Sequence, residues 1–96
     1  MALVKTTAGV ETATLTSTGN AVASAARLYS IYAVCAGSAG SIVLKNGSGG
    51  STLANIATPA DATATINVDF AVDGLDFPSA LHATLTNVTS VLFVYG

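Results

Sequence analysis

Apolar and polar residues alternate strictly in two segments of the second half of the chain. In residues 62–70, every even-numbered position is apolar and every odd-numbered position is Thr, Asn or Asp. Residues 81–86 alternate in the same way, with Leu or Ala at the odd positions and His or Thr at the even ones. A period of two places successive side chains on opposite faces of a β-strand. Both segments are therefore predicted to be strands with one face in a core and the other towards solvent or a partner.

Two further segments are apolar on both faces, residues 28–35 largely and residues 91–95 throughout. A strand with this pattern is typically covered on both sides. Residues 87–90, Asn-Val-Thr-Ser, predict a turn between residues 81–86 and the last strand. We therefore expect a C-terminal β-hairpin whose final strand is covered on one side by its own core and on the other by something else.

The remaining strand signals are shorter. Residues 10–16, 41–45 and 51–56 each favour a strand, and the last two flank the glycine-rich residues 46–50, which predict a hairpin turn. Residues 21–26 fit a helical turn, a loop or the start of a strand equally well.

About seven or eight short strands at intervals of roughly 8 to 14 residues predict an all-β fold. We expect one domain over residues 1–96, a small antiparallel β-sandwich or barrel of jelly-roll or immunoglobulin-like character. The immunoglobulin Cys/Trp/Cys core is missing, since the chain has one Cys and no Trp. Residues 1–8 are predicted to form an edge strand or an arm that contacts another subunit.

Several apolar or aromatic side chains are predicted to need cover from outside the domain. Tyr29 and Tyr32 lie on opposite faces if residues 28–35 form one regular strand, so one of them is expected at a rim or an interface. The candidate intersubunit contacts are Leu3, Val4, Tyr29, Tyr32, Phe93 and Tyr95.

Charge is scarce along the whole chain. Only 8% of the 96 residues are charged, against about 25% in an ordinary soluble domain. The mean hydropathy of +0.64 raises the question of a membrane. However, the most apolar stretch, residues 21–36, falls short of the roughly 20 residues needed to span a bilayer and contains Arg27. We expect neither membrane insertion nor a signal peptide. A surface with little charge repulsion instead predicts cover by other chains.

The basic residues are Lys5, Arg27 and Lys45, too few for a nucleic-acid interface. Cys35 has no partner for a disulfide, so it is expected to be a buried apolar side chain in a protein that folds in a reducing cytoplasm. A single histidine, His82, cannot form a zinc site from this chain alone. We expect it at the surface or an interface, with a metal site on a symmetry axis as the alternative.

Three acidic residues, Asp69, Asp73 and Asp76, lie close together in sequence. They predict either a plain turn or a calcium-binding loop, although their spacing does not match an EF-hand. Residues 37–40 and 47–50 lack the Lys of a phosphate-binding loop and are interpreted as hairpin turns. Since no Gly-x-Ser-x-Gly motif is present either, the sequence predicts no enzyme, no cofactor and no metal.

Three stretches, residues 2–15, 41–47 and 82–95, together resemble the small Thr/Ala/Gly-rich β-proteins of tailed-bacteriophage virions. The likeness spans most of the chain and rests on residue texture and strand spacing. It implies a structural protein that is made in the bacterial host cytoplasm and ends in the virion, as a capsid decoration or cement subunit. Its expected partners are copies of itself, with a trimer favoured, and the major capsid protein or another virion protein. The alternative is a tail or fibre-tip adhesin or carbohydrate-binding sandwich that uses Tyr29 or Tyr32 and residues 46–50.

Overall fold

The computed structural model describes residues 10–70 and 73–96, which form nine strands and no helix. The strands are β2 (Glu11–Leu15), β3 (Gly19–Val22), β4 (Ala26–Cys35), β5 (Gly40–Asn46), β6 (Thr52–Thr58), β7 (Thr65–Asp69), β8 (Leu75–Phe77), β9 (Leu81–Thr86) and β10 (Val88–Tyr95). The all-β class is thereby confirmed. The predicted segment 1–8, with Leu3 and Val4, lies outside the described residues.

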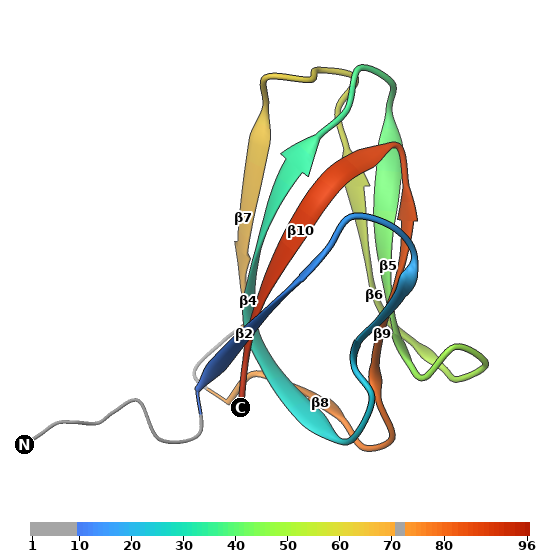
Figure 1. Cartoon of the computed structure of the whole chain (residues 1–96), viewed down its shortest axis with the longest axis vertical. Helices are drawn as coiled ribbons and strands as arrows, with labels where there is room; N and C mark the ends of the chain where they lie inside the picture. Colours follow the sequence, from blue (N-terminus) through green and yellow to red (C-terminus); the bar gives the residue numbers. More distant parts are fainter. Residues whose placement is uncertain (1–9, 71–72) are drawn as a thin grey trace, which may run out of the picture.

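The strands form two sheets that pack face to face (Figure 1). The first sheet has the order β2-β10-β4-β7, and β8 pairs with the beginning of β4. The second sheet has the order β3-β9-β5-β6. All of these pairs are antiparallel. The architecture is therefore the predicted small antiparallel sandwich.

The core lies between the inner faces of the two sheets, as expected for a sandwich. Phe77 and Phe93 are the largest of its side chains, and both are 0% exposed. The alternation predicted for residues 62–70 is confirmed in β7, where Ile66 and Val68 pack against the core and Asn67 is exposed. The apolar residues of the alternating pattern thus form the inner face of the strand.

The glycine-rich hairpin is confirmed, whereas the C-terminal hairpin is wrong. β5 pairs with β6 across a turn in which Gly47 has a φ of 84°. β9 and β10 instead belong to different sheets. The single residue between them, Asn87, has a φ of 51°, and its Nδ2 donates a hydrogen bond to the carbonyl oxygen of Ala39 at 2.9 Å. One left-handed residue is shorter than the two-residue loop of the tightest common hairpins, so it turns the chain from one sheet to the other.

The sequence patterns do not predict two short strands, β3 and β8. β3 covers the start of the ambiguous segment 21–26, which contains no helix. β8 is three residues long and follows the Asp73–Gly74 turn. Periodicity cannot identify strands this short, because it needs at least two full alternations to stand out.

Candidate functional site

A β-bulge in β4 decides where the two candidate tyrosines lie. Leu28 lies opposite Tyr95 of β10, and Ser30 lies opposite Val94, so Tyr29 is an extra residue without a partner on that strand. Leu28 and Ile31 both face the core, at 0% and 1% exposure. A regular strand would place Tyr29 and Tyr32 on opposite faces, but the bulge prevents this.

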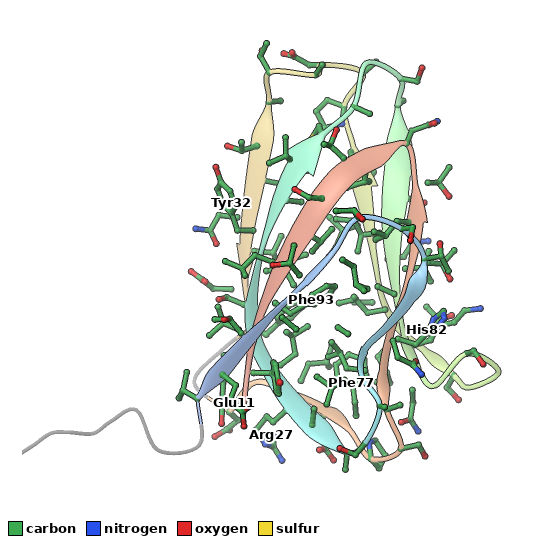
Figure 2. All side chains as sticks on the ribbon, viewed as in Figure 1. Glu11, Arg27, Tyr32, Phe77, His82 and Phe93 are labelled. Atoms are coloured by element: carbon green, nitrogen blue, oxygen red, sulfur yellow. The ribbon has the colours of Figure 1, made fainter. Side chains whose placement is uncertain are left out.

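Both tyrosines therefore lie on the outer face of the first sheet. The half-buried Tyr29 lies beside the Asp73–Gly74 turn, because a Cβ added to Gly74 would come within 3.1 Å of its Cδ1 and 2.9 Å of Arg27 Cγ. Tyr32 is more open, with 44% of its surface exposed, and points away from the sandwich in Figure 2. Tyr32 is thus the candidate contact that is most accessible in the described chain.

Cross-strand neighbours extend the surface around Tyr32. Leu92 of β10 lies opposite Tyr32 on one side, and Asn67 of β7 lies opposite it on the other. Thr14 of β2 continues the same row beyond Leu92. Directly opposite residues share a face of the sheet, so this row and its apolar neighbours form one surface. We call it the outer patch, and it consists of Thr14, Tyr32, Val34, Asn67, Leu92 and Val94.

The outer patch contains no charged side chain. Its apolar members other than Tyr32, namely Val34, Leu92 and Val94, are half-buried, while Thr14 and Asn67 are exposed. The charged residues on the same strands lie at their ends, with Asp69 of β7 opposite Ser30 and Glu11 of β2 opposite Tyr95. Covering this patch would therefore bury apolar area without stripping water from an ionised group.

The prediction for Phe93 is wrong. Its ring is 0% exposed and faces the core from β10, opposite Ile31. Because β10 alternates, the residues on either side of it, Leu92 and Val94, take the outward positions. A strand that is apolar on both faces does not reveal in sequence which of its two sets of residues points inward.

Tyr95 is half-buried and packs against the core. Its hydroxyl lies 3.4 Å from Glu11 Oε1. Partial burial raises the pKa of the phenol above its ordinary value of 10.0, and the nearby Glu11 carboxylate adds to this. Tyr95 therefore lies at the margin of the first sheet, outside the outer patch.

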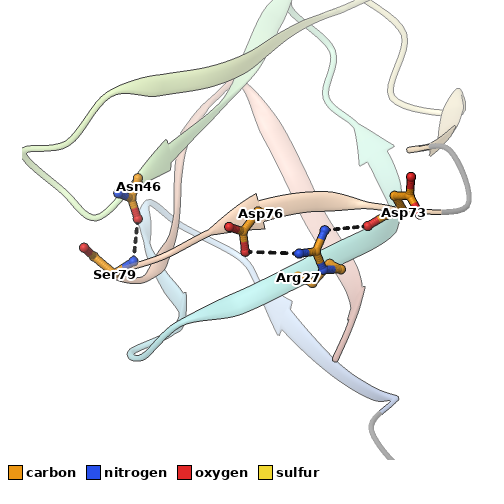
Figure 3. A network of polar contacts seen from close by, with 5 residues as sticks. All are labelled: Arg27, Asn46, Asp73, Asp76 and Ser79. Atoms are coloured by element: carbon orange, nitrogen blue, oxygen red, sulfur yellow. Dashed lines mark hydrogen bonds and ion pairs between the residues drawn. The ribbon is translucent and has the colours of Figure 1, made fainter.

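Arg27 contacts the acidic segment at Asp73 and Asp76, and the carboxylates of this segment do not form a cluster. Arg27 Nη1 donates a hydrogen bond to the carbonyl oxygen of Asp73 at 2.7 Å, and Nη2 lies 3.7 Å from Asp76 Oδ1 (Figure 3). Nearby, Asn46 Oδ1 accepts a hydrogen bond from the backbone N–H of Ser79 at 2.7 Å. Residues 10–70 and 73–96 contain no group of three or more His, Cys, Asp or Glu that could hold a metal ion. These contacts favour the turn interpretation of the segment.

His82 and Cys35 are both buried. The expectation of a surface histidine is wrong, because His82 is only 7% exposed although its neighbours across the second sheet are Asn20 and Lys45. Its Nδ1 is buried and has no hydrogen-bond partner among the described residues. Cys35 is 0% exposed and has a free thiol, as predicted for a buried apolar side chain.

The described part of the chain offers no pocket for a small molecule, and it has no helix long and apolar enough to cross a membrane. The glycan-binding alternative joins Tyr29 or Tyr32 to residues 46–50, but these belong to different sheets. Figure 2 shows Tyr32 and the β5–β6 loop on opposite sides of the sandwich. They do not form one site.

Comparisons of the chain with protein-family models, with curated proteins and with solved structures found no match.

Proposed function

We propose that the protein is a structural subunit of a tailed-phage virion, of the capsid decoration or cement type, and that it acts by contact alone. The observation that carries this proposal is the outer patch, an uncharged surface with an exposed tyrosine at its centre. The resemblance to small Thr/Ala/Gly-rich virion proteins supplies the setting. In that setting the partners are copies of the same chain, as a trimer, and the major capsid protein or another virion protein.

The chemistry of the patch suits a partner surface better than a soluble ligand. Tyr is a frequent anchor at protein interfaces, because it buries a large rigid ring and keeps a hydroxyl for a hydrogen bond. Fully burying an apolar side chain contributes about 1.5–3 kcal/mol. Leu92, Val94 and Val34 are already half-buried, so each would add only part of that amount. Many copies on a shell would compensate for a modest contribution from each.

The test uses phage particles from the source that carries the gene. Particles that lack the protein are mixed with wild-type protein or with the Tyr32→Asp variant, and bound protein is measured after sedimentation. Wild type is expected to bind in a fixed copy number and to delay heat-induced release of DNA. Tyr32→Asp is expected to lose at least tenfold in affinity, because it places a charge at the centre of the patch.

Ser48→Asp is the matched control, since Ser48 is exposed in the β5–β6 loop of the second sheet. It adds the same charge away from the outer patch and is expected to bind like wild type. Wild-type protein that neither occurs in purified particles nor binds to them would overturn the proposal.

The second candidate function is a tail adhesin that binds carbohydrate. The observation in its favour is the exposed Tyr32 ring next to Asn67, an aromatic platform with an amide beside it. It predicts that glycans bind to wild type and not to Tyr32→Ala. A glycan array without any positive signal, together with binding to intact capsids, would decide for the decoration role.

A further inference from the structure

The edge of the second sheet at β6 differs from the other described edges. Sheet edges are normally protected by short length, charged side chains, proline or bulges. β2 carries Glu11 and β7 carries Asp69, while β3 has four residues and a register shift against β9. β6 has seven residues without any charge or proline. Its one register shift lies at the end where Lys45 pairs with Thr52.

Among the described strands β6 pairs only with β5, so within residues 10–70 and 73–96 its other side presents unpaired backbone groups. Along an antiparallel strand, every second residue directs its N–H and C=O away from a given neighbour. Leu53 is 37% exposed, and Asn55 and Ala57 are also exposed. The regular part of the strand, from Ala54 to Ala57, is thus open to a further strand, whereas Thr58 at its end is buried.

The sequence of β6 is chemically symmetric about Asn55. Read outwards from Asn55, the strand has an apolar residue, another apolar residue and then a threonine in both directions, Thr-Leu-Ala-Asn-Ile-Ala-Thr. A two-fold axis perpendicular to the sheet pairs residues at equal distances from its centre. Placed at Asn55, such an axis pairs Ala54 with Ile56 on the core side and Leu53 with Ala57 on the outer side. Moved by one residue, it would pair Asn55 with an alanine or leucine.

We propose that two copies of the protein pair through β6, antiparallel and centred on Asn55. Their second sheets, each four strands wide, then become one continuous sheet. The two Asn55 side chains lie opposite each other and hydrogen-bond through their amides. A second copy fits this edge better than an unrelated strand because Asn55 then pairs with Asn55, and the apolar residues 53 and 54 pair with the apolar residues 57 and 56.

This contact depends on strand geometry and does not require the virion role. It uses the edge of the second sheet, whereas the outer patch lies on the first, so a threefold assembly and the β6 contact are compatible. The pairing of one short strand from each copy buries less surface than the roughly 1,200–2,000 Å² of a standard stable interface. We therefore expect an association that strengthens with protein concentration over the micromolar range.

The first experiment measures the mass of the purified protein by light scattering over a dilution series. Asn55→Lys and Asn55→Asp each place two like charges opposite one another at the axis, which disfavours the pair. Each variant alone is expected to have half the wild-type mass at high concentration, and an equal mixture of the two is expected to restore it. Ser38→Lys, in the exposed loop between β4 and β5 and outside both the outer patch and β6, is the control and should keep the wild-type mass.

The second experiment does not depend on charge. Residues directly opposite in antiparallel strands have Cα atoms about 4.5–5.5 Å apart, which lies within the range of a disulfide. Asn55→Cys is therefore expected to form a covalent dimer on air oxidation, while Ser38→Cys is not. Cys35 does not interfere, because its thiol is fully buried. A wild-type mass unaffected by Asn55→Lys, or cross-linking of Asn55→Cys no faster than that of Ser38→Cys, would overturn the proposal.

Discussion

At the scale of single residues, Gly40 holds the start of β5 against the corner that joins the two sheets. A Cβ built on Gly40 would lie 1.7 Å from the carbonyl oxygen of Thr86, a backbone atom that cannot rotate away. Gly37, three residues earlier, has nothing within 4 Å of the same position. A substitution at Gly40 therefore tests the steric clash, and the same substitution at Gly37 measures the effect of replacing a glycine where no clash occurs.

We expect Gly40→Ala to lower the free energy of unfolding by about 1–3 kcal/mol, the usual range for forced overpacking. Gly37→Ala should leave it unchanged or raise it by up to about 1 kcal/mol, because alanine restricts the unfolded chain. Urea denaturation at neutral pH measures both. Equal effects of the two substitutions on the free energy of unfolding would contradict this account, because they would show that β5 can move away from Thr86 without cost.

His82 is the second residue with a specific expectation, because its buried Nδ1 has no hydrogen-bond partner in the part of the chain that the structure describes. An unpaired buried polar atom costs roughly 1–3 kcal/mol. His82→Leu removes this atom and fills most of the space, so we expect the free energy of unfolding to stay the same or rise. His82→Ala leaves a cavity and should lower it. Both are measured by thermal and urea denaturation, and a larger loss for His82→Leu than for His82→Ala would contradict this account.

At the scale of elements, local patterns identified most strands but not the connections between them. The alternation in β7 and β9 and the glycine-rich β5–β6 turn were sufficient because they depend on neighbouring residues. The bulge at Tyr29 and the corner at Asn87 depend on pairing between strands distant in sequence. The sequence identifies Tyr32 as a candidate contact. It does not show that Leu92 and Val94 of β10, instead of Phe93, lie on the same face of the sheet as Tyr32.

The connection between β6 and β7 provides a prediction about pH. Asp61 Oδ1 accepts hydrogen bonds from the backbone N–H of Thr63 at 2.9 Å and from its hydroxyl at 2.7 Å. These bonds lower the pKa of the Asp61 carboxyl below its ordinary value of 3.8. The folded protein then binds this proton less readily than the unfolded chain. The contribution to stability is complete above the ordinary pKa and is lost as the pH falls through the lowered value.

We expect Asp61→Ala to be less stable than wild type at neutral pH and the difference to shrink at acidic pH, below the ordinary carboxyl pKa of 3.8. Urea midpoints measured at a series of pH values test this. Asn67→Ala, which removes an exposed side chain without a titratable group, should show a difference from wild type that does not change with pH. A constant Asp61→Ala difference would contradict the hydrogen-bonded turn.

At the scale of the whole molecule, the low charge content marks particular surfaces. The outer patch and the β6 edge are both free of charged side chains. The charged residues in the described chain are found elsewhere, as in the Arg27–Asp76 pair beside β8 and in Glu11 near Tyr95. The sequence shows the shortage of charge, but only the pairing of strands shows where uncharged residues gather into one surface.

The two sides of β10 allow folding and contact to be separated. Phe93 is fully buried between the sheets, while its neighbour Leu92 is half-buried in the outer patch. We expect Phe93→Ala to lower the free energy of unfolding by about 3–5 kcal/mol, a large share of the roughly 5–15 kcal/mol available to a domain. Leu92→Ala should cost at most about 1.5 kcal/mol, since a half-exposed side chain recovers less on burial.

Urea denaturation of the two variants gives their stabilities, and sedimentation with particles that lack the protein gives their binding. Leu92→Ala should remain folded and bind more weakly than wild type, because it removes apolar area from the outer patch. Phe93→Ala should lose binding only in proportion to the fraction of unfolded protein. If Phe93→Ala stayed fully folded, the inner face of β10 would not be needed for folding. If Leu92→Ala kept its stability and bound like wild type, the outer face of β10 would not take part in the contact.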